Sequence, residues 1–154
     1  MEWSRYGQVE CRNKVFLLAN MIVPILTGAV IYYVTSPDVI FVRQLDTILG
    51  MRVHMYDISY HSTIVRFIRY YALDMLWGYA LVFALYFILD NNTASLFKIF
   101  VIAYVFSVII EILQLTSFVK GTFDVFDLVV ELIAEIAAVF IIKNDFFRGG
   151  TKEI

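Results

Sequence analysis

Residues 111–140, "EILQLTSFVKGTFDVFDLVVELIAEIAAVF", decide the fold, because this segment is apolar enough to enter a membrane yet carries acids at regular intervals. From residue 124 onward it holds Asp124, Asp127, Glu131 and Glu135. On a helix that turns by about 100° per residue, the spacing i, i+3, i+7, i+11 places all four acids within an arc of about 80°. The spacing therefore predicts one acidic stripe along a helix, with Glu135 about 16 Å from Asp124 along the axis.

Such a stripe cannot face lipid. An acid near the centre of a membrane helix costs about 2.5–3.5 kcal/mol, while each Leu, Ile, Phe or Val returns about 0.3–0.6 kcal/mol. About a dozen apolar residues then return roughly 4–7 kcal/mol, which two central acids nearly cancel. We therefore expect the stripe to face other helices or a water-filled cavity.

The composition of the whole chain points to an integral membrane protein. Hydrophobic residues make up 61% of the 154 residues and charged residues only 17%, against roughly 45–50% and about 25% in soluble domains. The length fits a single domain spanning residues 1–154. The formal net charge of -2 gives no indication of nucleic-acid binding.

We predict an all-α, polytopic fold with four transmembrane helices, because a spanning helix needs about 20 mostly apolar residues. The predicted spans are about 15–34, 70–89, 96–119 and 125–142. In the first outer loop, "SPDVIFVRQLDTILG" predicts a short interfacial helix with Ser36 as N-cap, Pro37 in the first turn and Gly50 at the end. An ordinary solvated helix is the alternative.

The distribution of Lys and Arg predicts the orientation. With four spans the two termini share a side, which would carry seven of the 12 basic residues against five on the other side. Arg12 and Lys14 directly precede the first span. We therefore expect both termini in the cytoplasm.

The predicted spans bring their polar residues to one depth near the outer surface. We expect Glu111, Asp124 and Asp127 to be candidate catalytic groups for acid–base chemistry. The candidate ligand-binding residues are Arg66, Arg69, Asp74, Gln114, Lys120 and Glu131. Single buried polar residues often serve only to hold membrane helices together, but five acids meeting basic residues favour a functional site.

These residues resemble the motifs of the VanZ-like family of small bacterial membrane proteins. The similar stretches are "EILQ" (111–114), "KGTFDVFD" (120–127) and, before them, "RYYALDMLWGYALVFAL" (69–85). The chain departs from the family pattern at Glu131, where an Asn is usual, and at Lys120, where the basic residue is shifted. The resemblance covers roughly residues 60–142 and implies a multi-pass protein of the bacterial cell membrane. The family's namesake is linked to teicoplanin resistance.

Three functions remain open at this point. The first is an envelope protein that binds or modifies an amphiphile at the outer leaflet, either a phosphorylated membrane lipid or a lipophilic glycopeptide, and thereby contributes to teicoplanin resistance. No cofactor is predicted, although acids at headgroup depth could hold a divalent cation that bridges to phosphate. The second is an enzyme acting on a lipid-linked phosphate, without a recognisable nucleophile pair. The third is a proton-coupled carrier or a helper subunit of a membrane complex, for which a homodimer would supply more helices.

Overall fold

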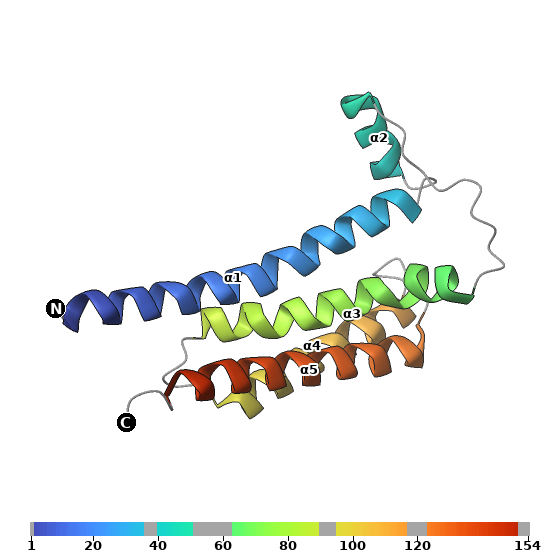
Figure 1. Cartoon of the computed structure of the whole chain (residues 1–154). Coiled ribbons are helices and arrows are strands. Elements are labelled where there is room, and N and C mark those ends of the chain that lie inside the picture. Colours follow the sequence, from blue (N-terminus) through green and yellow to red (C-terminus); the bar gives the residue numbers. More distant parts are fainter. Residues whose placement is uncertain (1, 36–39, 51–62, 90–94, 117–122, 151–154) are drawn as a thin grey trace.

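The computed structural model describes residues 2–35, 40–50, 63–89, 95–116 and 123–150. The described residues form five α-helices (Figure 1) and, within these ranges, no strand. The helices are α1 (Glu2–Thr35), α2 (Ile40–Leu49), α3 (Thr63–Ile88), α4 (Leu96–Leu115) and α5 (Val125–Gly150). The all-α prediction is confirmed for this part of the chain.

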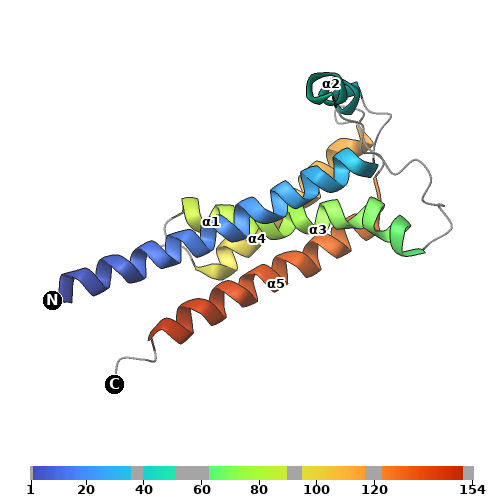
Figure 2. The ribbon, with the colours of Figure 1, turned by 45° about the horizontal axis from the view of Figure 1, so that its top comes forward.

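The long helices pack side by side around α3. Helix α3 contacts α1, α4 and α5, and α4 also contacts α5. Both termini lie at one end of this bundle, and α2 lies at the other end in both views (Figures 1 and 2). An even number of long helices therefore brings the chain back to its starting side.

Helices α1 and α3 are joined by a polar contact within an otherwise apolar interface. The Tyr79 hydroxyl donates a 2.6 Å hydrogen bond to Asn20 Oδ1, and Asn20 Nδ2 donates to the Phe16 carbonyl at 2.9 Å. Pro24 follows one turn later and is buried inside the helix. Because proline lacks the N–H that would bond the carbonyl four residues earlier, this turn is locally weakened.

Helices α3 and α5 approach closely at a glycine. A Cβ atom placed on Gly78 would lie 3.4 Å from both Cα and the carbonyl oxygen of Glu131. A methyl group would just fit, whereas a larger side chain would push the helices apart. This close approach brings the acidic face of α5 against α3.

Three helices are long and apolar enough to cross a membrane: Lys14–Thr35, Tyr71–Ile88 and Leu96–Leu115. The first two match the predicted spans 15–34 and 70–89 to within one residue, and the third ends at Leu115, short of the predicted 119. These apolar helices make the chain an integral membrane protein. Helix α5 has sufficient length at 26 residues, but its apolar stretch contains Asp127, Glu131 and Glu135. Apolar composition therefore does not identify α5 as a span, and the fourth predicted span stays a prediction.

Helix α2 ends as the sequence predicts. Gly50 adopts a left-handed backbone with φ of 63°, and its N–H donates to the Asp46 carbonyl at 3.0 Å, which is a common way for a helix to end. The Tyr33 hydroxyl donates a 2.6 Å hydrogen bond to Asp46 Oδ1 and so ties α2 to α1. The predicted N-cap Ser36 and the following Pro37 lie outside the described residues.

Candidate functional site

The acidic stripe of α5 faces the inside of the bundle, as predicted. Glu135 is 0% exposed and Glu131 is 7% exposed, while Asp124 and Asp127 are half-buried. Large apolar side chains occupy the opposite face, where Ile133 and Ile136 are more than half exposed. Helix α5 is therefore amphipathic, with its acids turned toward protein.

Glu111 on α4 organises the end of the bundle near α2. It is buried, and each of its carboxyl oxygens accepts a hydrogen bond: Oε1 from Gln114 Nε2 at 3.2 Å and Oε2 from the Asp124 backbone N–H at 3.3 Å. Asp124 in turn accepts a 2.9 Å bond from the Phe126 backbone N–H. Asp124 thus caps the start of α5, and Glu111 fixes this start against α4.

Asp74 and Asp127 complete an acidic cluster around Glu111. Asp74 comes from α3 and is half-buried, like Asp127 on α5. The charges of Asp74, Glu111 and Asp124 all act on Asp127. Residues from three helices therefore converge as the sequence predicts, and we name Asp74, Glu111, Asp124 and Asp127 the outer acidic cluster.

A second group lies deeper along the same faces. The Ser107 hydroxyl on α4 donates a 3.2 Å hydrogen bond to Glu135 Oε1, and all three of Ser107, Glu131 and Glu135 are buried. Among the described residues, Oε2 of Glu131 and Oε2 of Glu135 are buried without a hydrogen-bond partner. We name Ser107, Glu131 and Glu135 the inner acidic group.

Beyond the inner acidic group the bundle interior becomes apolar. The buried cluster there contains Leu17, Val82, Phe83, Tyr86, Ile99, Ala103, Ala138 and Ile142. On α4 the buried face reads Glu111, Ser107, Ala103, Ile99 in order toward the termini. The interior is therefore polar in the half near α2 and apolar in the half near the termini.

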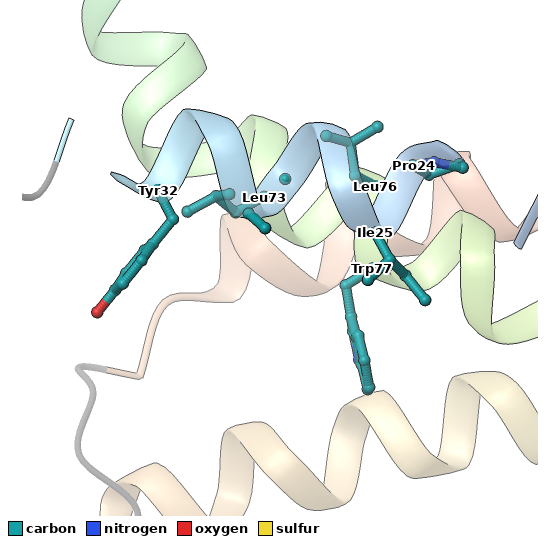
Figure 3. Close-up of a pocket in the computed structure, with 8 residues that line it drawn as sticks. Pro24, Ile25, Tyr32, Leu73, Leu76 and Trp77 are labelled. Atoms are coloured by element: carbon teal, nitrogen blue, oxygen red, sulfur yellow. The ribbon is translucent and has the colours of Figure 1, made fainter. Parts of the chain in front are cut away.

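An apolar groove of about 240 Å³ lies between α1 and α3 (Figure 3). Its lining residues are Pro24, Ile25, Gly28, Ala29, Tyr32, Leu73, Leu76 and Trp77. Tyr32 and Trp77 extend from the two helices toward the same side, as Figure 3 shows. Asp74 of the outer acidic cluster belongs to the same turn of α3 as Leu73, but it is not among the residues that line the groove.

Some predicted site residues lie beyond what the structure describes. Arg66 and Arg69 belong to α3, but their side chains are not described, and Lys120 falls in the undescribed segment between α4 and α5. Their role as counter-charges stays a prediction. Within the described residues, no three His, Cys, Asp or Glu side chains are grouped so as to hold a metal ion.

Two residues of the inner acidic group were not among the predicted site residues. Glu135 belongs to the predicted stripe but lies deepest in it, and Ser107 is a common residue in membrane helices. The spacing of four residues between Ser107 and Glu111 does predict one polar face of α4 that matches the stripe, but it does not single out Ser107 as the partner of Glu135.

Comparisons with known proteins leave the family open. No family model, curated protein or solved structure matches the chain. The resemblance to VanZ-like proteins therefore stays a prediction based on the quoted motifs.

Proposed function

We propose that α5 is the fourth membrane-spanning helix. An acid costs free energy on membrane insertion when its side chain meets lipid. Glu131 and Glu135 are buried against the other helices of the bundle and so do not meet lipid. What remains outside is apolar, including Phe126 and Phe140, which are 67% and 63% exposed. The span 125–142 then measures about 27 Å, close to the thickness of the hydrocarbon core.

The orientation belongs to the same proposal. Basic residues flanking the first span favour both termini in the cytoplasm of a bacterial cell. Helix α2 then lies at the outer surface, where Ile40 and Ile48, which are 73% and 78% exposed, would enter the boundary between headgroups and acyl chains. The hydrogen bond between Tyr33 and Asp46 supports this position, because it holds α2 at the end of α1.

In this arrangement the protein binds an amphiphile from the outer leaflet. The observation that carries the proposal is that one turn of α3 serves both features: apolar Leu73 and Trp77 line the α1–α3 groove, and Asp74, between them in the sequence, belongs to the outer acidic cluster. An apolar chain fits the groove, and a polar headgroup would then meet the acids. Ligand sites commonly combine such an apolar lining with a few charged groups.

The charges of the cluster favour a headgroup with an amine. Asp74, Asp124 and Asp127 are all acidic, and a carboxylate binds an ammonium group through a charge-assisted hydrogen bond. A lipoglycopeptide of the teicoplanin type offers both an acyl chain and an amine, and the VanZ-like motifs favour the same class. In the cell, binding of such a lipoglycopeptide would contribute to teicoplanin resistance. A membrane lipid with an amine in its headgroup is the other candidate ligand.

Glu111 has a structural role in this proposal. Both of its carboxyl oxygens accept hydrogen bonds that fix Gln114 and the start of α5. A general acid or base needs an oxygen that can reach the substrate. Binding rather than acid–base chemistry is therefore the function that we propose, and the catalytic assignment of Glu111, Asp124 and Asp127 stays a sequence prediction.

The test is equilibrium binding of teicoplanin to the protein in lipid nanodiscs, with protein-free nanodiscs as reference. We expect the double variant Asp124→Asn, Asp127→Asn to bind at least roughly tenfold more weakly, because a hydrogen bond to a charged group contributes about 1.5–3 kcal/mol. Asparagine still caps a helix, so α5 should keep its start. The charge-preserving control Asp127→Glu should bind like the wild type.

A second arm tests the groove. Gly28→Leu adds a side chain where a Cβ would already lie 3.7 Å from Leu73 Cδ2, so it should weaken binding of acylated teicoplanin. Val105→Leu, on the exposed face of α4, is the matched control. Unchanged affinity in the double Asp variant, or equal affinity for teicoplanin and its deacylated core, would contradict the proposal.

A further inference from the structure

The inner acidic group holds two carboxyl groups that amphiphile binding does not use. Glu135 is fully buried and Glu131 is more than nine-tenths buried. Ser107 satisfies only one oxygen of Glu135, and Oε2 of each glutamate has no hydrogen-bond partner among the described residues. A bare charged oxygen in an apolar interior is very costly unless a cation or a proton neutralises it.

The described groups that act on Glu131 are acids and one hydroxyl. They come from α3 (Asp74), from α4 (Glu111 and Ser107) and from its own helix (Glu135). Gly78 on α3 packs directly against the Glu131 backbone and contributes no side chain. A bound proton would remove the negative charge that burial makes costly for each glutamate.

The neighbouring acids also connect the pair to the surface. Glu131 lies one turn from Asp127 and one turn from Glu135, which corresponds to steps of about 6 Å along α5. Asp127 and Asp74 are half-buried rather than fully buried, so they meet the outside at the α2 end. The α5 acids therefore follow one another along one helix face, as a file from the half-buried Asp127 to the buried Glu135.

The file stops at Glu135. The next residues along this face of α5 are Ala138 and Ile142, both 0% exposed, and Phe83 and Ile99 are buried beside them in the same apolar cluster. The polar group among the buried residues of this cluster is the Tyr86 hydroxyl, and none of these residues carries a carboxyl group that would continue the file toward the termini. The described acids therefore reach the glutamates from the α2 end alone.

We propose that Glu131 and Glu135 form a proton-exchange site inside the bundle, which takes up and releases protons only through the outer acidic cluster. On release, the O–H bond of the carboxyl group breaks, its electron pair stays on the carboxylate oxygen, and the proton passes by way of Asp127 or Asp74 to the solution. Uptake is the reverse. This inference goes beyond amphiphile binding and does not depend on it.

Infrared spectroscopy of the full chain in lipid bilayers tests the site directly. The carbonyl stretch of a protonated carboxyl group is separate from the bands of a carboxylate, and it shifts when O–H becomes O–D. We expect a protonated-carboxyl band that disappears as the pH rises and that shifts in D₂O. Glu131→Gln and Glu135→Gln should each remove part of this band, and the double variant should remove both parts.

The control is Asp46→Asn on α2, which lies outside both acidic groups and should leave the band unchanged. A band that responds neither to pH nor to D₂O would overturn the proposal, because the glutamates would then be sealed, permanently neutral structural groups. A band of unchanged size in both Gln variants would overturn it as well. Where a variant fails to fold, the wild-type protein still tests the proposal, because a band that does not shift in D₂O would overturn it.

One-sided access has its own test. Vesicles containing the protein and a trapped pH indicator should acidify no faster than protein-free vesicles after external acid is added. Proton entry that Glu135→Gln abolishes would show a path through the whole bundle and would overturn the one-sided exchange site.

Discussion

The hydrogen bond between Ser107 and Glu135 gives the sharpest prediction about what holds the bundle together. Ser107→Ala removes the hydroxyl that donates to Glu135 Oε1 at 3.2 Å, a distance longer than the 2.5–3.0 Å usual for O–H···O bonds. Hydrogen bonds between membrane helices average about 0.6 kcal/mol, and an unsatisfied buried oxygen costs about 1–3 kcal/mol. The long distance selects the lower part of that range, so we expect a loss of about 1 kcal/mol.

A double-mutant cycle isolates this bond. Glu135→Leu removes the acceptor and fills the site with an apolar side chain of similar size, which is often neutral or stabilising for buried charged groups. In that background Ser107→Ala deprives no Glu135 oxygen of its hydrogen bond. We therefore expect it to cost almost nothing there, which gives a coupling energy of about 1 kcal/mol between the two positions.

The measurement is reversible unfolding of the purified protein in mixed micelles with increasing SDS, followed by circular dichroism. Thr27→Val is the control, since the Thr27 hydroxyl is exposed and bonds only the Val23 carbonyl of its own helix; its effect should stay within about 0.5 kcal/mol. Equal costs of Ser107→Ala in both backgrounds, within about 0.3–0.5 kcal/mol, would refute the reasoning.

Three further predictions concern the helix contacts. Gly78→Leu should destabilise the bundle by about 1–3 kcal/mol in the same unfolding assay, because the leucine side chain would meet the Glu131 backbone. Gly78→Ala should cost less than about 1 kcal/mol. Equal losses of stability in the two variants would contradict the close packing of α3 against α5. Asp124→Ala should cost about 1 kcal/mol through loss of the α5 cap, with Asp124→Asn close to neutral. Tyr33→Phe should release α2 from Asp46, seen as a broader α1–α2 distance distribution between spin labels; an unchanged distribution would show that other contacts hold α2.

The inward-facing stripe of α5 was predictable from the sequence because it depends only on helix geometry and on the cost of an acid in lipid. Asp124, Glu131 and Glu135 share a face by their spacing, and that face has to be covered by protein. The same logic located Asp74 and Glu111 near the stripe. Gly50 ended α2 as predicted because a left-handed residue at that point favours glycine.

The contacts between helices were not predictable in the same way. The pairing of Ser107 with Glu135 depends on how far α4 slides and rotates against α5, which spacing along one helix does not specify. The bond from the Asp124 N–H to Glu111 depends on the path of the chain from α4 to α5. The α1–α3 groove likewise depends on how α1 and α3 pack near Gly28. The sequence of either helix gives the residues on one side of the groove but not the distance to the other side.

The unequal lengths of the helices have a mechanical consequence. Helix α1 begins at Glu2, although its apolar stretch begins only at Lys14, so about 18 Å of helix precedes that stretch. Helix α5 likewise continues from Ile142 to Gly150, about 12 Å further. Helix α1, which packs against α3, thus extends well beyond its apolar stretch, and a protein fused to the N-terminal end of α1 would be separated from that stretch by about three turns of helix.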